Sequence, residues 1–358
     1  MRSVVRSAGT AVLAAVALVP AFAQSKDVFV MSRAGWSVAV DGTGGELLAP
    51  KGYWFVGFAE GMFVVSDGRQ VGFADAAGRT VIPLRYAWAW PFRDGRAVVE
   101  FPGGGTGYID RTGALVGRAD FKGAHDFHED RAVVITRSGY AFVNRRAKVV
   151  IPGPFDMAED FSEGLAPVMR AYRWGYVDRA GRQAIPIQFG AAGQFVGGLA
   201  PATVARTEQI AFGEPIEGTG FIDASGRFVI APKYSAAEPF SDGLALVTAG
   251  SVYRPSTNHL GREMAKGWQM FIDRTGAVRI VIAEDVVRVR SFREGLAYVE
   301  YKNGRKGFID RTGTCVVWLD VWAAGAGDFQ NGCARVSYAD GRTGLIDRRG
   351  VYVWPPTN

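Results

Sequence analysis

Aspartates recur along the chain in a motif close to Gly-aromatic-Ile/Val-Asp-x-x-Gly. A row of carboxylates is the donor set for calcium or for acid–base catalysis. Asp at the first position of a type I turn accepts hydrogen bonds from nearby backbone N–H groups, and the following Gly tolerates positive φ. Since one member is Asn, we predict turns rather than metal or catalytic sites. The series is Asp41, Asp75, Asp110, Asn144, Asp178, Asp223, Asp273, Asp310 and Asp347.

Residues 125–130 contain a cluster of two histidines, His125 and His128, with three acidic residues. A metal site would need both histidines and a carboxylate at fixed geometry. The same segment of the next repeat, residues 159–163, is also polar. We therefore predict a solvated polar rim there, and no metal site.

Other catalytic motifs find little support. The glycine-rich segment 103–107 lacks the Gly-Lys-Ser/Thr of a phosphate-binding loop and precedes a predicted strand, not a helix. No Gly-x-Ser-x-Gly sequence occurs. We predict no enzymatic activity and no cofactor; a glycoside hydrolase, which needs only two suitably placed acids, is the least favoured alternative.

The Asp motif alternates with a second motif, Phe-x-x-Gly-x-Ala-x-Val, so that the two define one repeated unit. Successive Asp positions are 34, 35, 34, 34, 45, 50, 37 and 37 residues apart. The long spacings come from insertions in one segment type of two adjacent units. The Phe positions are Phe58, Phe92, Phe127, Phe161, Phe195, Phe240, Phe292 and Phe329.

Each unit predicts three short strands. The first follows the Phe, as in residues 165–168, and the second precedes the Asp, as in residues 175–178. The third follows the turn, as in residues 228–231. Apolar residues three apart in the next segment predict a tight helical turn packed on the sheet. Asp130 replaces the Gly of the Phe motif, which favours a positive φ there.

These motifs resemble the bacterial WG-repeat family. The matching segments are Phe-Ser-Glu-Gly-Leu-Ala at residues 161–166, Trp-Gly-Tyr-Val-Asp at residues 174–178 and Phe-Arg-Glu-Gly-Leu-Ala at residues 292–297. The Trp-Gly pair itself occurs in this context only at Trp174. The resemblance implies a scaffold or binding array without a common catalytic motif, and transfers no active-site residues.

The predicted fold class is all-β: about nine three-stranded units in tandem, each a hairpin plus a third strand. An open, curved array or solenoid is favoured, with propeller-like closure as the alternative. Each unit can bury its apolar face only against neighbours. Residues 24–358 therefore form one predicted domain.

Residues 1–23 predict a signal peptide. Arg2 and Arg6 precede an apolar stretch that is too short to span a bilayer, and we expect cleavage after Ala23. The mature chain is then expected in the bacterial periplasm or outside the cell, without stable membrane insertion. Loss of two arginines lowers the net charge from +6 to +4. This charge does not favour a nucleic-acid partner.

The chain has two cysteines, in adjacent predicted units. Cys315 lies in a third strand and Cys333 in the next first strand. An oxidising compartment would permit a disulfide between them. The sequence leaves this pairing open.

The two insertions, residues 203–219 and 248–269, are the strongest candidates for a binding surface. Insertions at one edge of a repeat array map to one face, often the binding face, although long surface loops also cost little. The candidate residues are Tyr253, Arg254, His259, Arg262 and Trp268 in the second insertion and Arg206 and Phe212 in the first. We expect an envelope or secreted protein as partner; the alternative is a cell wall or other glycan bound by exposed aromatic residues.

Overall fold

The structure is a computed structural model that describes residues 28–33, 36–48, 53–205, 218–250, 253–255, 262–264 and 267–356. These residues form strands and turns only. None of them belongs to a helix long and apolar enough to cross a membrane.

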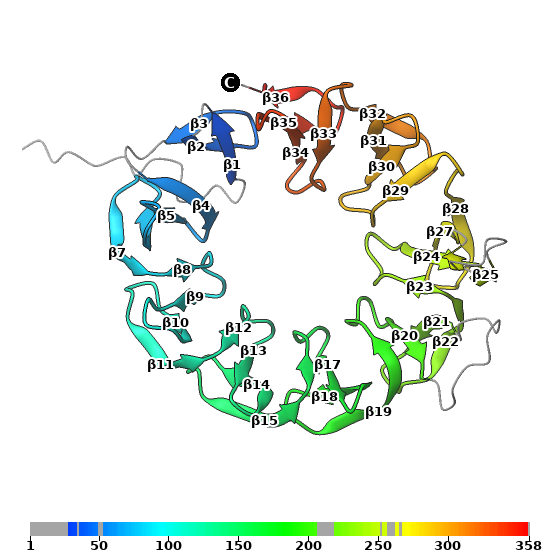
Figure 1. Ribbon diagram of the computed structural model, residues 1–358, viewed down its shortest axis with the longest axis horizontal. Coiled ribbons are helices and arrows are strands. Elements are labelled where there is room, and N and C mark those ends of the chain that lie inside the picture. The colour runs from blue at the N-terminus through cyan, green and yellow to red at the C-terminus, as the bar shows by residue number, and fades with distance from the viewer. Residues whose placement is uncertain are drawn as a thin grey trace, which may run out of the picture.

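The strands form small antiparallel sheets that follow one another around a ring (Figure 1). We number the units from the N-terminus. Unit 1 contains β1 (Val28–Arg33), β2 (Trp36–Asp41) and β3 (Glu46–Leu48). Unit 2 contains β4 (Trp54–Ala59), β5 (Met62–Ser66), β6 (Val71–Asp75) and β7 (Thr80–Tyr86); unit 3 contains β8 (Trp88–Ala89), β9 (Ala97–Glu100), β10 (Thr106–Ile109) and β11 (Leu115–Phe121). Unit 4 contains β12 (Gly123–Ala124), β13 (Arg131–Thr136), β14 (Gly139–Asn144) and β15 (Val149–Phe155).

The later units repeat this pattern. Unit 5 contains β16 (Met157–Ala158), β17 (Leu165–Arg170), β18 (Arg173–Asp178) and β19 (Gln183–Ala192), and unit 6 continues from the end of β19 with β20 (Ala200–Val204), β21 (Thr219–Ile222) and β22 (Phe228–Tyr234). Unit 7 contains β23 (Ala236–Ala237), β24 (Ala245–Ala249), β27 (Trp268–Ile272) and β28 (Val278–Val281), with an inserted hairpin of β25 (Tyr253–Pro255) and β26 (Arg262–Met264). Unit 8 contains β29 (Val286–Val289), β30 (Ala297–Tyr301), β31 (Lys306–Ile309) and β32 (Cys315–Trp318), and unit 9 contains β33 (Ala323–Ala326), β34 (Cys333–Tyr338), β35 (Thr343–Asp347) and β36 (Tyr352–Trp354).

The predicted all-β array of repeated units is confirmed, and units 2 to 9 add a short inner strand to the three predicted ones. The predicted helical turn between units is wrong. The chain bends at Ala87 after β7, and β8 then pairs with β9. Because the bend interrupts the strand alternation, the buried Tyr86, Ala89 and Phe92 fall three apart without a helix.

The core lies between neighbouring units. One cluster joins Phe73 and Ile82 of unit 2 to Phe92 and Val99 of unit 3. At most junctions an aromatic side chain of the strand that precedes the Asp turn contacts the motif Phe of the next unit. Phe73 of β6 and Phe92, for example, have ring centroids 4.8 Å apart. Such tilted pairs add about 0.5–1.5 kcal/mol beyond burial. The repeated phenylalanines therefore hold the units to one another.

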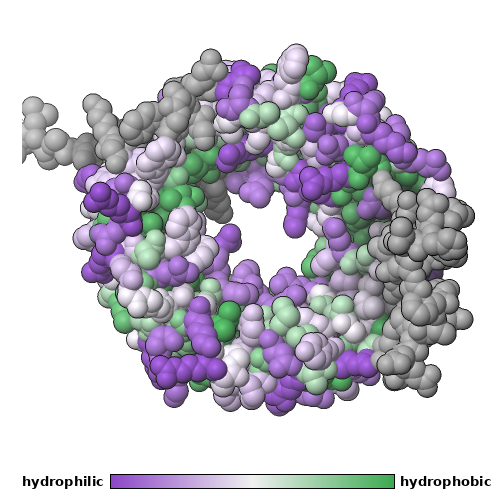
Figure 2. Space-filling model, viewed as in Figure 1, coloured by the Kyte–Doolittle hydropathy of each residue, from purple (hydrophilic) through white to green (hydrophobic). Residues whose placement is uncertain are grey.

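The curvature of the array brings its two ends together. Met31 and Val40 of unit 1 share a buried cluster with Leu345 and Trp354 of unit 9, and Cys333 Sγ contacts the Gly42 carbonyl at 3.4 Å. Within the described residues no sheet contains strands from both ends. The ends thus meet through side-chain packing rather than strand pairing. Figure 2 shows a central opening surrounded mainly by hydrophilic residues.

Candidate binding surfaces

Strand alternation gives the ring two distinct faces. In an antiparallel four-stranded unit, the turns after the first and third strands lie at one end, and the turn after the second strand lies at the other. We call the first end the clamp face; in unit 3 it carries residues 90–96 and 110–114. The opposite end, with residues 101–105 in unit 3, is the insertion face.

The Asp motif forms the turns that the sequence predicts. Asp110 Oδ1 accepts from the N–H groups of Thr112 at 2.9 Å and Ala114 at 3.1 Å, while Gly113 has φ +82°. The hydrogen bond from the Thr112 hydroxyl is the main reason that the pKa of Asp110 is lowered. The same two backbone bonds recur at all nine motif positions, including Asn144. The first oxygen of each side chain therefore serves the turn.

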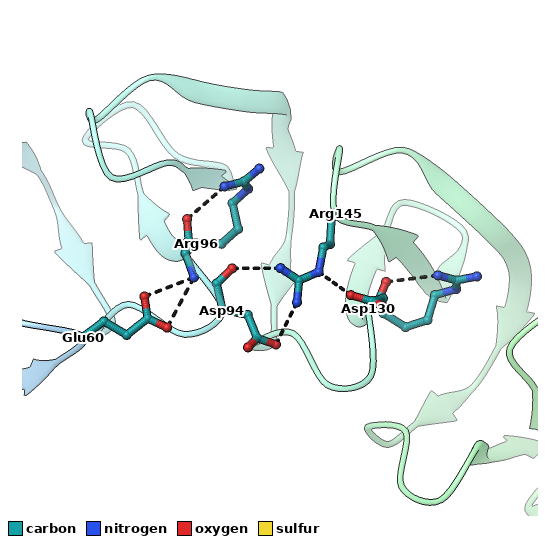
Figure 3. Close-up of polar contacts among 7 residues, drawn as sticks. Glu60, Asp94, Arg96, Asp130 and Arg145 are labelled. Atoms are coloured by element: carbon teal, nitrogen blue, oxygen red, sulfur yellow. Dashed lines mark hydrogen bonds and ion pairs between the residues drawn. The ribbon is translucent and has the colours of Figure 1, made fainter. Parts of the chain in front are cut away.

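A second set of carboxylates joins neighbouring units at several junctions of the clamp face. The Glu60 carboxylate accepts from the N–H of Gly95 at 3.1 Å, and Arg145 bridges Asp94 and Asp130 (Figure 3). We call a carboxylate that binds the turn N–H groups of the following unit a clamp. Asp130 has φ +64°, as predicted for the residue that replaces Gly.

The complete clamp contains an arginine as well. Glu294 of unit 8 accepts from Asn331 N at 2.6 Å and Gly332 N at 2.8 Å, and Arg348 Nη2 lies 2.7 Å from Glu294 Oε2. Burial raises the pKa of Glu294, but Arg348 and the two N–H donors outweigh it and leave a lowered pKa. Clamps join units 2 and 3, 4 and 5, 5 and 6, 7 and 8, and 8 and 9 through their turns.

The histidine cluster also forms contacts between units. His125 Nδ1 lies 3.1 Å from Asp160 Oδ1, and His128 Nε2 lies 3.6 Å from Asp160 Oδ2. Arg93 Nε lies 2.8 Å from Asp126 Oδ2. The hydrogen bond that Asp160 accepts from His125 raises the pKa of His125 despite partial burial, whereas burial raises the pKa of Asp126. Both imidazoles remain substantially exposed, and no group of three or more metal ligands occurs in the described part of the chain.

The two insertions interrupt equivalent positions of neighbouring units. The first separates β20 from β21 and the second separates β24 from β27, which are the second and third strands of units 6 and 7. Thr203 pairs with Thr219, and Ala249 pairs with Trp268, so that the strands flanking each insertion stay in register. Both pairs of strand ends therefore belong to the insertion face.

A cavity of about 260 Å³ lies beside the second insertion, between units 7 and 8. Trp268 and Gln269 line it from β27, Glu284 and Val286 from the start of unit 8, and Lys302 from the turn after β30. The Trp268 side chain is 54% exposed. An indole surface, a cation and a carboxylate thus converge at one opening.

A family model described as WG containing repeat matches residues 72–101, 140–170, 174–204 and 220–253. These segments fall on successive units of the ring. The chain is a WG-repeat protein.

The fold of this WG-repeat protein is similar to solved structures of very different sequence. A structure titled "Crystal structure of the eukaryotic initiation factor" matches with a TM-score of 0.59 and 9% identity, over 93% of this chain and 96% of that one. BamB from Moraxella catarrhalis matches with a TM-score of 0.45 and 12% identity, over 82% and 93% of the two chains. At these identities the likeness concerns the fold alone. No curated protein matches the chain.

The structure places part of the predicted binding set in the WG-repeat ring. Trp268 lines the cavity, whereas Lys302 and Glu284, which join it there, lie in regular repeat segments that sequence comparison did not single out. Of Tyr253, Arg254 and Arg262, the structure describes the backbone of the β25–β26 hairpin. Arg206, Phe212 and His259 lie outside the described residues.

The disulfide that the sequence allowed is not formed, and Cys315 and Cys333 are both thiols. Cys315 packs at the edge of the core between units 7 and 8. Cys333 is buried in the cluster that joins units 9 and 1. The two thiols thus face different unit interfaces, although their strands belong to adjacent units.

Proposed function

We propose that this WG-repeat protein is a non-catalytic scaffold of the bacterial periplasm or cell exterior that binds another protein through its insertion face. One observation carries the proposal: both insertions lie between the second and third strands of neighbouring units, while the flanking strands keep their register. The ring then supplies a fixed frame, and the inserted segments supply side chains that the repeat does not need.

The hydrogen bonds of the repeated polar residues support this division between a structural ring and recognising insertions. The motif Asp side chains accept the backbone N–H groups of their own turns. The clamp glutamates accept those of the next unit. Polar groups engaged in this way have defined structural roles, which favours a recognition site elsewhere on the ring.

The cavity beside β27 gives the partner a specific anchor point. Trp268 offers a large apolar surface with a hydrogen-bond donor, and Lys302 and Glu284 provide charges at its rim. Aromatic residues in such pockets contribute disproportionately to protein–protein affinity. We therefore place Trp268 at the centre of the proposed interface.

Deletion of residues 251–266 removes the inserted hairpin and tests the proposal without disturbing β24 and β27. Because Ala249 pairs with Trp268, the deletion leaves Gly250 and Gly267 as a two-residue hairpin turn, a combination that such turns favour. The variant should melt as the wild type does and lose the partner proteins crosslinked to the wild type in native envelopes. An unchanged set of crosslinked proteins would refute the proposal.

A point substitution gives a sharper version of the same test. Trp268→Ala should weaken partner binding by about 30-fold or more, the usual effect of a hot-spot residue. The matched control is Trp88→Ala, which removes a 42% exposed tryptophan from β8. Strand β8 lies across the ring from β27 (Figure 1). Equal losses in both variants would contradict a localised site.

The exposed indole of Trp268 beside charged groups also favours a second candidate, a glycan-binding role. Indole faces stack on sugar rings, and Lys302 and Glu284 can hydrogen-bond hydroxyl groups. Cosedimentation with purified peptidoglycan, abolished by Trp268→Ala and retained by Trp88→Ala, would support this role. Absence of binding to both peptidoglycan and a glycan array would eliminate it.

A further inference from the structure

One junction of the ring lacks the clamp carboxylate because its position is occupied by glycine. Glu163 of unit 5 binds the N–H groups of Gly197 and Gly198 of unit 6. At the next junction the equivalent of Glu163 is Gly197 itself, and the turn that follows is Asp242–Gly243 of unit 7. No side chain of the described residues accepts from the Gly243 N–H.

An arginine stands at this junction where complete clamps also have one. Arg179 pairs with Glu129 at 2.7 Å, and Arg348 pairs with Glu294 at 2.7 Å. Arg274 of unit 7 occupies the same place in its Asp turn. It is exposed and pairs with no carboxylate in the part of the chain that the structure describes.

The position of Arg274 relates it directly to the missing side chain. A Cβ atom added at Gly197 would clash with the Arg274 guanidinium group. The guanidinium therefore extends into the space that a glutamate at this position would enter. Gly197 has φ +62°, close to the +53° of Glu294 and the +54° of Glu163.

We propose that the junction of units 6 and 7 is a binding site for an external carboxylate, held by the Gly243 N–H and the Arg274 guanidinium. The complete clamp between units 8 and 9 shows how such a group is bound, because Glu294 is held there by two turn N–H groups and Arg348. Hydrogen bonds to charged groups are shorter and stronger than neutral ones. This site lies on the clamp face and does not depend on the proposed function of the insertion face.

The carboxylate has two sources, a small anion or an acidic side chain of another protein. Acetate represents the first, and a capped Ala-Ala-Glu-Ala-Ala peptide the second, with Ala-Ala-Gln-Ala-Ala as its uncharged match. The readout is the amide resonance of Gly243 in protein labelled with ¹⁵N-glycine. Both carboxylate probes should shift this resonance with a saturable dependence on concentration, and the Gln peptide should not.

Three variants localise the response. Arg274→Gln should weaken carboxylate binding by about tenfold or more, since it removes a charge-assisted hydrogen bond. Arg311→Ala, which removes the corresponding exposed arginine at the junction where Asp242 already binds Gly295, should leave it unchanged. Gly197→Glu should supply the carboxylate internally, raise the melting temperature and abolish the response to either probe.

The outcomes are distinct. Similar affinity for acetate and the Glu peptide assigns the site to small anions, and tenfold or greater preference for the peptide assigns it to an acidic protein segment. A Gly243 resonance that responds to neither probe overturns the proposal. An equal loss in the Arg274 and Arg311 variants also overturns it, because it would reflect general charge rather than a site. Should the Gly197 variant fail to fold, the two arginine variants still decide.

Discussion

The carboxylate of Glu294 is held by two turn N–H groups and Arg348, so its charge should contribute measurably to stability. Glu294→Gln keeps the shape of the side chain and one acceptor oxygen, but removes the charge shared among Asn331, Gly332 and Arg348. Charge-assisted hydrogen bonds contribute about 1.5–3 kcal/mol each when buried. The Arg348 side chain is 53% exposed, so solvent reduces its share to that of a surface pair.

We therefore expect Glu294→Gln to lower the free energy of unfolding by about 1–2 kcal/mol at pH 7. For a chain of this size that corresponds to a fall of about 1–3 °C in melting temperature. The measurement is thermal unfolding followed by circular dichroism. The control is Glu284→Gln, an exposed glutamate outside the clamps, which should change the melting temperature little.

The effect should depend on pH in a defined direction. The folded-state pKa of Glu294 lies below its usual value, so the clamp stabilises the fold above the unfolded pKa, near 4.3. This contribution is lost as the pH falls through the lowered folded pKa. The difference between wild type and Glu294→Gln should therefore shrink as the pH falls below about 4. Identical melting temperatures at pH 7, or a difference that is the same at pH 7 and pH 3, would show that the Glu294 charge does not stabilise the fold.

Three further perturbations test other parts of the ring. Trp354→Ala removes a buried side chain from the contact between units 9 and 1 and should cost about 3–5 kcal/mol in urea unfolding; a loss under 1 kcal/mol would argue against a tightly packed closure. His125→Asn removes the contact with Asp160 that raises the pKa of His125 in the folded protein. This contact stabilises the fold below about pH 6.5, and its contribution is lost as the pH rises through the folded pKa. The variant should therefore melt at a lower temperature than the wild type at pH 5.5 and at nearly the same temperature at pH 9; the reverse pattern would contradict this sign. In the native protein the half-buried Cys315 should react with iodoacetamide faster than the buried Cys333. Peptide mass spectrometry follows both reactions. Equal rates would mean that the contact between units 9 and 1, which buries Cys333, opens readily.

The repeat and its turns could be predicted because their interactions are local. Asp110 bonds to residues two and four positions ahead, so spacing and residue type are enough to identify the turn. A positive φ at Asp130 followed from its alignment with glycines. The spacing of Tyr86, Ala89 and Phe92 misled the prediction, because a strand with one bend and a helical turn bury the same positions.

The clamps and the closure could not be predicted because their partners are distant in the chain. Glu294 accepts hydrogen bonds from N–H groups 37 and 38 residues away, and its own motif does not indicate which residues these are. Contact between units 1 and 9 depends on the curvature summed over all junctions. The available signal was the recurrence of a carboxylate before the turn glycine, together with its loss at Gly197.

The division between a structural ring and a recognising insertion face is tested most directly by crosslinking mass spectrometry of the mature protein in its own cells, with a lysine-reactive reagent. We expect crosslinks to one protein partner from Lys302, beside the cavity, and from Lys266 in the second insertion. Lys148, in the turn that Asn144 forms in unit 4 on the clamp face, should give none. Partner crosslinks confined to Lys148, with Lys302 and Lys266 unmodified by any partner, would mean that the insertion face does not bind the partner.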